Sequence, residues 1–293
     1  MPEVPNRPAA PALFDRELVA RRYSVRPEKR PDFVTALVLD DLAHRLGAIR
    51  RRFERAVILG PDPRLLPAGG DSADGPIAFT RVGTLIEAPG ILAFDTAGPR
   101  LPFDDCDLVV SVLDLQIVDD VPRHLVEVRR HMRPDGLFIG ATLGGNSLTE
   151  LRQAWLAAES ESGIGAAPRV APMLDIRDAG RLLQHAGFAL PVTDTETLKV
   201  RYADPLALMR EIKALGAANL MRERLRIPVT RALLAAAARH YQALASDPDG
   251  RVRATLEIVW MSGWVPDRSQ QKPLPPGSAR RRLRDVLHDK SDG

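Results

Sequence analysis

The sequence lacks the residues on which several classes of protein depend. Its 293 residues include one cysteine, Cys106, which excludes an internal disulfide and leaves no basis for a cysteine-rich metal site. No apolar run approaches the ~20 residues of a membrane-spanning helix. Positive and negative side chains number 41 and 38, so the net charge of +3 gives no general argument for nucleic-acid binding. We expect a cytoplasmic protein without a transmembrane segment or a nucleic-acid partner.

Common catalytic and metal-binding motifs are also missing. The sequence contains no G-x-S-x-G, H-E-x-x-H or Walker pattern. His124 and His131 are seven residues apart, but no carboxylate or cysteine accompanies them at ligand spacing. We therefore expect surface histidines rather than a metal site, and we assign no catalytic residue.

Short apolar segments that are rich in Val, Ile, Leu and Phe predict buried parallel strands at 56–59, 77–79, 91–94, 107–113 and 136–143. An amphipathic helix is expected before them, within 32–53. Between the last two strands, Val121, Leu125, Val128 and Met132 share one helical face. This order predicts a βαβ unit with a right-handed crossover.

The second half of the chain alternates helices with two further strands. A helix capped by Asn146 or Ser147 is expected through Glu159, and a second helix stops at Gly187. Strands at 197–202 and 252–264 predict a late antiparallel pair. The expected divisions are an extended segment at 1–31, a folded domain at 32–265 with a helical insertion at 203–250, and a Pro/Arg-rich tail at 266–293.

Several stretches resemble one family. DLVVSVLDLQIVDDVPRHLVEVRRHMRPDGLFIGATLGGNSLTELR (107–152) is similar to class I S-adenosylmethionine-dependent methyltransferases. LFDR, GGNSLTELR, LLQHAGF and ATLEIVWMSGW are similar to the complex I assembly factor 5 branch, which is related to the BioC methyltransferases. The resemblance implies an α/β, Rossmann-like fold with a mostly parallel sheet. It also implies binding of S-adenosylmethionine, arginine hydroxylation, and NADH dehydrogenase subunits or an active paralogue as partners.

The resemblance also implies positions for the cofactor. The family loop D-L-G-C-G-x-G corresponds to 58–64, which places Gly60 and Asp62 beside the ligand. Asp95, after the third strand, corresponds to a position that often contacts adenine. Leu113, Asp114 and Leu115 correspond to the loop that borders the methionine moiety.

The same alignment shows departures around the cofactor. Pro61 and Pro63 replace loop residues, which removes two N–H donors and fills space that glycines leave open. Arg64 brings a positive charge near the sulfonium. Thr80 and Arg81 stand where an acidic residue usually holds the ribose. The segments before and after this second strand are too short for full crossover helices.

Gln116 and Ile117 stand where the family commonly has His and Trp. Three functions remain open. The first is a protein-modifying, S-adenosylmethionine-dependent enzyme with an altered loop. The second is a non-catalytic assembly chaperone or binding partner that keeps the fold. The third is a small-molecule methyltransferase similar to BioC.

Overall fold

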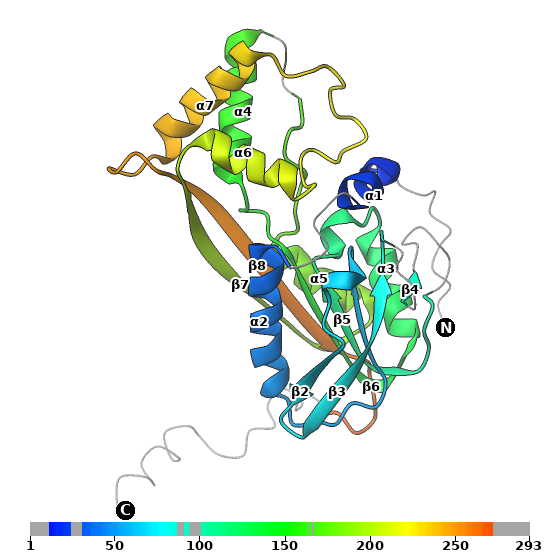
Figure 1. The fold of residues 1–293 in the computed structure, drawn as a ribbon. Coiled ribbons are helices and arrows are strands. Elements are labelled where there is room, and N and C mark those ends of the chain that lie inside the picture. The colour runs from blue at the N-terminus through cyan, green and yellow to red at the C-terminus, as the bar shows by residue number, and fades with distance from the viewer. Residues whose placement is uncertain are drawn as a thin grey trace, which may run out of the picture.

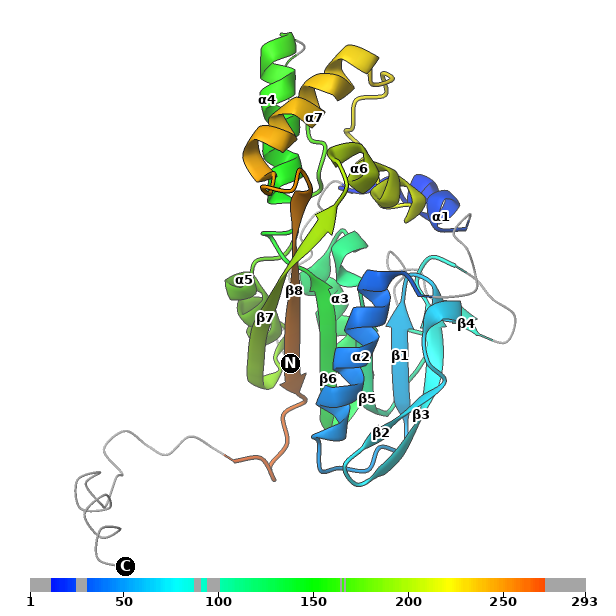
Figure 2. The ribbon, with the colours of Figure 1, turned by 60° about the vertical axis from the view of Figure 1, so that its left-hand side comes forward.

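The fold is built on one mixed sheet, shown in Figure 1 and, turned by 60°, in Figure 2. The computed structural model describes residues 12–24, 31–86, 91–93, 101–163, 165 and 167–271. The strands are β1 (Ala56–Gly60), β2 (Gly69–Ser72), β3 (Gly75–Gly83), β4 (Leu92–Ala93), β5 (Cys106–Val112), β6 (Met132–Leu143), β7 (Ala189–Tyr202) and β8 (Val252–Trp264).

The strand order is β2-β3-β1-β5-β6-β8-β7, with β4 paired to β3. Strands β4, β3, β1, β5 and β6 run parallel, whereas β8 is antiparallel to both β6 and β7. All five residues of β1 and all seven of β5 are buried, as expected for strands covered on both faces. The predicted fold class, a parallel sheet ending in an antiparallel pair, is therefore confirmed.

The crossover from β1 to β3 contains no α-helix. A 3₁₀ turn, η1 (Pro63–Leu65), is followed by β2, which forms an antiparallel hairpin with β3. The hairpin satisfies backbone hydrogen bonds that a helix would otherwise satisfy internally. The shortened crossover expected from the sequence is confirmed on this side of β3.

Helices cover the two faces of the sheet. Helix α2 (Phe33–Gly47) begins at Asp32, whose carboxylate accepts from the N–H groups of Val34 and Thr35. It packs Val38, Leu42 and Leu46 against residues of β1, β5 and β6 that point to its side. Alternate strand residues point to the opposite face, where α3 (Val121–Arg130) and α5 (Ile176–Ala186) pack.

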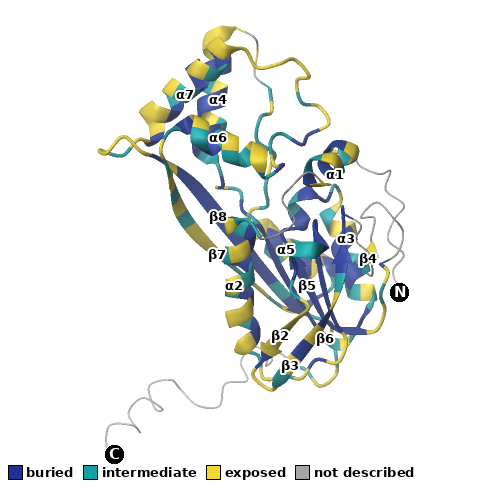
Figure 3. Ribbon diagram, viewed as in Figure 1, coloured by how far each residue is buried: buried dark blue, intermediate teal, exposed yellow. Residues whose placement is uncertain are grey.

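Three helices form a cap beyond one end of the sheet (Figure 1). They are α4 (Thr149–Ser162), α6 (Pro205–Ala214) and α7 (Arg231–Ala245). Trp155 and Ala158 of α4 pack with Ala237 and Tyr241 of α7 in a separate apolar cluster, and Figure 3 shows these helices buried mainly where they face one another. The Tyr241 hydroxyl donates to the carbonyl of Arg253, which ties the cap to β8.

The N-terminal segment is not wholly extended, so the prediction for 1–31 is wrong within its described part. Residues 16–24 form helix α1 (Arg16–Ser24), which buries Leu18, Val19 and Tyr23. Asp15 accepts from the N–H of Leu18, as an N-cap does. Burial against Ile117 and Leu220 makes this short helix stable, although its nine residues would be marginal alone.

Two local predictions also need correction. Helix α4 starts at Thr149 after Leu148, whose φ is 55°, and not from a cap at Asn146 or Ser147. Those two side chains instead bond to Glu257 on β8, which removes them from the helix terminus. Strand β7 starts at Ala189, eight residues before the expected strand, because it pairs with nearly all of β8.

Candidate cofactor and ligand site

The carboxyl ends of β1, β3, β5 and β6 meet at the edge of the sheet below the cap. Open α/β sheets bind ligands at this edge. The loop after β1 holds Gly60 and Asp62, and the loop after β5 holds Leu113, Asp114 and Leu115. Asp95, the sixth predicted site residue, lies outside the described residues.

Two glycines at this edge are required by packing within the protein. A Cβ on Gly60 would lie 2.9 Å from the carbonyl oxygen of Val112 and 3.4 Å from the side chain of Leu66. A Cβ on Gly83, at the end of β3, would lie 2.7 Å from Cγ of Pro63. Pro63 therefore fills the space against β3, and the loop after β1 packs on the sheet.

Asp62 is held by a neighbour in its own loop. Its side chain is 2% exposed, and the Arg64 guanidinium donates to both carboxylate oxygens, from Nε and Nη2, at 2.8 Å each. The backbone N–H of Arg64 adds a third bond of 3.1 Å, which caps η1. A bidentate pair of this kind occupies most of the acceptor capacity of a carboxylate.

Strand β3 extends further than the sequence indicated, and this changes which residue stands at its end. Thr80 and Arg81 lie inside the strand, which runs to Gly83. The next residue is Thr84, which is 3% exposed. Its hydroxyl donates to Oδ1 of Asp114 at 2.5 Å. Thr84, rather than the Thr80 and Arg81 expected from the sequence, therefore follows the end of β3, where the family usually has an acidic residue.

Asp114 and His124 form a buried pair behind the edge of the sheet. Asp114 is fully buried, and its Oδ2 lies 3.7 Å from Nε2 of His124, which is 4% exposed. Burial raises the pKa of Asp114, and the charge of His124 and the bond from Thr84 only partly offset this. Burial likewise lowers the pKa of His124 against the opposing effect of Asp114. Both shifts favour the neutral forms.

The prediction of surface histidines is wrong. His124 is buried against Asp114, and the His131 side chain is 12% exposed and bonds to Asp104. The ring of His131 also lies edge-on to Phe103, with centroids 6.2 Å apart. Glu127 of α3 lies 3.9 Å from Nε2 of His131, and the fold brings Asp114 and Asp104 from other elements to the two histidines. Among the described residues, no group of three His, Cys, Asp or Glu side chains could hold a metal ion.

The three residues after β5 have different surroundings. Leu113, with φ of 51°, lines a small cavity together with Pro61, Asp62 and Leu66. Leu115 is 3% exposed and packs in the core on the α3 side of the sheet. Asp114 faces Thr84 and His124. The structure thus brings Asp62 and Leu113 together at one cavity and directs Asp114 and Leu115 elsewhere.

This cavity, at the position where the family fold holds its cofactor, has a volume of about 80 Å³. Sites for drug-sized ligands span about 300–1,000 Å³. Pro63 packs against Gly83, and Arg64 engages Asp62, so the loop presents neither bare backbone nor a free carboxylate. The described residues of this loop therefore do not fit S-adenosylmethionine in the way that the family loop does.

A second cavity of about 530 Å³ adjoins the first and shares Tyr23, Val34, Gln116 and Leu143 with it. It lies between the sheet edge, α1, α4 and α6, and most of its walls are apolar. Sequence patterns carry little signal for this cavity, because its walls come from segments that are distant along the chain. The LFDR motif is one sequence feature connected with the cavity. The backbone N–H groups of Leu13 and Phe14 donate to Asp119, and these bonds position α1 beside the cavity.

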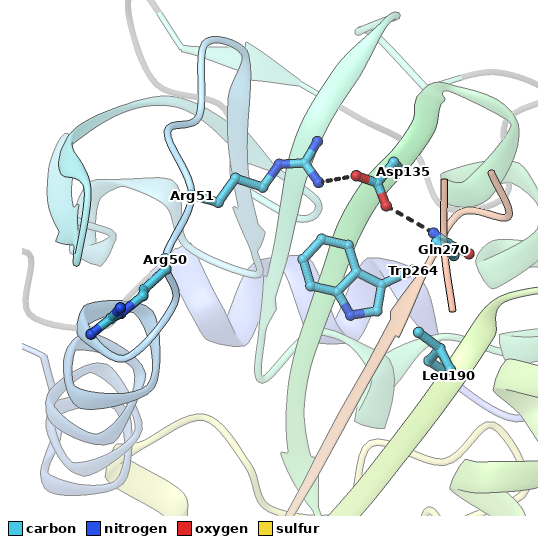
Figure 4. Close-up of a pocket in the computed structure, with 6 residues that line it drawn as sticks. All are labelled: Arg50, Arg51, Asp135, Leu190, Trp264 and Gln270. Atoms are coloured by element: carbon cyan, nitrogen blue, oxygen red, sulfur yellow. Dashed lines mark hydrogen bonds and ion pairs between the residues drawn. The ribbon is translucent and has the colours of Figure 1, made fainter. Parts of the chain in front are cut away.

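A third hollow lies at the opposite end of the sheet and is shown in Figure 4. Arg51 donates to Asp135 at 2.6 Å, Asp135 accepts from Gln270 at 2.9 Å, and the Arg51 guanidinium lies 5.4 Å from a Trp264 ring. Asp135 and Arg51 therefore satisfy each other. The hollow is remote from the carboxyl ends of the parallel strands, so we do not take it as the family site.

The GGNS segment (144–147) contacts β8, and this contact accounts for its residue types. Gly144 leaves room for Glu257, since a Cβ there would lie 2.6 Å from Cγ of Glu257. The Glu257 carboxylate accepts from the backbone N–H and the side-chain amide of Asn146, at 3.0 and 2.8 Å. Ser147 bonds to both backbone groups of Glu257. The motif therefore joins the start of α4 to β8.

Comparison with known proteins agrees with this architecture. Residues 82–140 match the methyltransferase-domain family model. The chain is 33% identical to the arginine-hydroxylase NDUFAF5 of Rattus norvegicus over 292 residues, covering 95% of this chain and 84% of that protein. It belongs to the class I methyltransferase family that contains NDUFAF5. The malonyl-[acyl-carrier protein] O-methyltransferase of Halorhodospira halophila is a relative at 32% identity, with 91% and 94% of the two chains covered.

One further relative is covered over a smaller share of its length. The NDUFAF5 protein of Danio rerio is 38% identical over 181 residues, which cover 61% of this chain and 56% of that protein. Among solved structures, the YcgJ protein of Bacillus subtilis superposes with a TM-score of 0.49 at 10% identity, covering 79% of this chain and 99% of YcgJ. No helix among the described residues is long and apolar enough to cross a membrane.

Proposed function

We propose that this protein is a non-methylating member of its family that acts as a binding protein in NADH dehydrogenase assembly. The observation that carries the proposal is the filled cofactor site, where Pro63 packs on Gly83 and Arg64 neutralises Asp62. Family membership beside NDUFAF5 supports the assembly role. The two enzymatic alternatives, a protein-modifying enzyme and a BioC-like methyltransferase, both require S-adenosylmethionine at this site.

A surface on the cap favours a protein partner. The segment 225–231 carries three exposed apolar side chains, with Leu225 38%, Ile227 69% and Val229 41% exposed. Arg226 and Arg231 are exposed among them. Neighbouring apolar side chains that remain in water mark interaction surfaces, and the flanking arginines favour an acidic partner. We propose this segment as the contact for an NADH dehydrogenase subunit.

The residues that directly precede the segment are held in place. Phe14 pairs with Met221 in an isolated β-bridge, and the N–H of Arg222 donates to the carbonyl of Leu13 at 2.8 Å. Arg224 donates to Asp15 at 2.8 Å in a pair that is mostly shielded from water. These contacts fix where the chain enters the segment, which reduces the conformational entropy that the segment loses on binding.

The test is recovery of NADH dehydrogenase subunits on the tagged chain from its native cells, scored by mass spectrometry. We expect wild type and Leu244→Asp to recover them, because Leu244 is an exposed apolar residue on α7 outside the segment. Ile227→Asp should lose most of the recovery while its melting temperature stays unchanged. Recovery of a methyltransferase-fold paralogue alone would favour the second partner predicted from the family. Equal recovery by all three proteins would refute the proposed contact.

The cytoplasmic location expected from the sequence stays a prediction. Fractionation of the native cells, with the chain detected in the soluble or membrane fraction, would test it.

A further inference from the structure

The cavity between the sheet edge, α1, α4 and α6 is large enough for a small-molecule ligand. It has a volume of about 530 Å³, within the range of small-molecule sites. Its walls include Ile117 beyond β5, Leu143 at the end of β6, Trp155 of α4, and Leu208, Met209 and Ile212 of α6. A cavity with such walls favours a hydrocarbon occupant, because its surface offers contact area and few polar partners.

The polar side chains in the walls are largely committed to other parts of the protein. Arg169 donates to the buried Glu159 at 2.7 Å and stacks on Trp155 at 5.0 Å. Thr255 bonds to Glu150, and the Asn219 amide donates to the carbonyl of Pro168 at 2.8 Å. An inserted peptide would bring backbone N–H and C=O groups that find few partners here. An alkyl chain carries no such groups.

Positive charge gathers beside the same cavity. Lys213 lines it and forms no ion pair within the part of the chain that the structure describes. Arg22 lies next to it, donating to the carbonyl of Asn219 at 3.3 Å. Partial burial, followed by repulsion from Arg224 and Arg21, lowers the pKa of Arg22. Glu211 is an acid in the wall, and it is bonded to Tyr202. An anion would relieve the repulsion among the arginines.

We propose that this cavity binds a single-chain anionic amphiphile of the fatty-acid class, with its hydrocarbon chain against α4 and α6 and its carboxylate beside Lys213 and Arg22. This ligand goes beyond the assembly role and does not depend on it. Of the 225–231 surface, Val229 also lines the cavity, whereas Leu225, Ile227 and the loop residues Pro61 and Asp62 do not.

Calorimetric titration with octanoate, decanoate and dodecanoate below their micellar concentrations tests the proposal. We expect saturable binding of one dodecanoate per chain, with affinity rising about tenfold for each two methylenes. Met209→Trp, which fills the cavity from a half-buried position on α6, should weaken binding at least tenfold. Lys213→Gln should weaken dodecanoate binding several-fold and leave dodecanol binding unchanged. Arg210→Gln is the matched control, an exposed cation on the same helix that does not line the cavity.

A second measurement does not depend on the folding of a filled-cavity variant. A bromine-labelled dodecanoate should quench the fluorescence of Trp155, and Trp155→Phe should remove that quenching while Trp260 and Trp264 continue to emit. No binding at millimolar dodecanoate would overturn the proposal. So would quenching that survives Trp155→Phe, or binding to phosphatidylglycerol vesicles without binding to monomeric dodecanoate. Preferential binding of an acidic apolar peptide over dodecanoate would also overturn it, in favour of a peptide site.

Discussion

Asp62 and Arg64 show at the scale of single residues how the cofactor loop has changed. In the family loop, small residues expose backbone to the ligand, whereas here a carboxylate points inward and is held by an arginine two residues later. The pair stabilises the loop without a ligand.

Arg64→Ala should destabilise the fold by about 1–3 kcal/mol, because it leaves the Asp62 carboxylate buried without its partner. Urea unfolding monitored by circular dichroism gives this value. The double variant Asp62→Ala/Arg64→Ala should lose less than the sum of the two single variants, since neither charge is then stranded. Additive losses in the free energy of unfolding, or a loss below about 0.5 kcal/mol for Arg64→Ala, would show that Asp62 and Arg64 do not form a stabilising pair.

The buried Asp114 predicts a specific dependence of stability on pH. Its folded-state pKa is raised by burial, so its contribution to stability is fully present below the ordinary Asp pKa of about 3.9 and is lost as pH rises through the folded pKa. The folded-state pKa of His124 is lowered, so its contribution is present above about 6.5 and is lost as pH falls. Asp114→Asn removes the first effect and also removes the charge that opposes the lowering of the His124 pKa.

We therefore expect the melting temperature of Asp114→Asn, relative to wild type, to increase as pH rises from about 4 toward the folded pKa of Asp114. Thermal unfolding across pH 4.5 to 8 measures the difference. Asp71→Asn, on the exposed part of β2, controls for the substitution itself. Parallel curves for wild type and Asp114→Asn would show that the Asp114 pKa is not raised.

At the scale of elements, the cap is joined to the sheet by a contact between the β6–α4 loop and β8. Gly144 and Asn146 fit around the carboxylate of Glu257, which is 7% exposed. The GGNSLTELR motif was evident in the sequence and carried the family resemblance. Its physical reason was not evident, because Asn146 and Glu257 are 111 residues apart.

Gly144→Ala should cost about 1–3 kcal/mol, because its Cβ would displace the Glu257 side chain. In a Glu257→Ala background the same substitution should cost clearly less, giving a coupling of about 1 kcal/mol. A double-mutant cycle by chemical denaturation measures this coupling. If the cost of Gly144→Ala is the same in both backgrounds, the contact with Glu257 is not what requires glycine.

At the scale of the whole molecule, the sheet was predictable because its parallel strands are short apolar runs that remain buried on both faces. The missing helix between β1 and β3 was also predictable, since prolines and glycines crowd a segment too short for it. Helix α1 was missed because nine residues give a weak periodic signal, and burial against Ile117 and Leu220 stabilises them. The large cavity was missed because α1, α4 and α6 meet only in the folded chain.

Of the predicted site residues, Asp62 and Leu113 do meet at one cavity. The partner of Asp62 could not be read from the sequence, because a loop arginine is usually solvated and its direction depends on backbone geometry. The Thr84–Asp114–His124 cluster was missed for a related reason. Predicting this cluster requires knowing that β3 ends at Gly83, beyond the apolar residues from which the strand was predicted, so that Thr84 reaches Asp114.

We propose that the cofactor side of this methyltransferase fold is closed to S-adenosylmethionine. Isothermal titration calorimetry of the full chain with S-adenosylmethionine measures whether it is. The malonyl-[acyl-carrier protein] O-methyltransferase of Laribacter hongkongensis, 34% identical to this chain, serves as the positive control. A filled loop and a cavity of about 80 Å³ predict no saturable heat at millimolar ligand. Saturable binding with a dissociation constant in the micromolar range would show that the cofactor side is open.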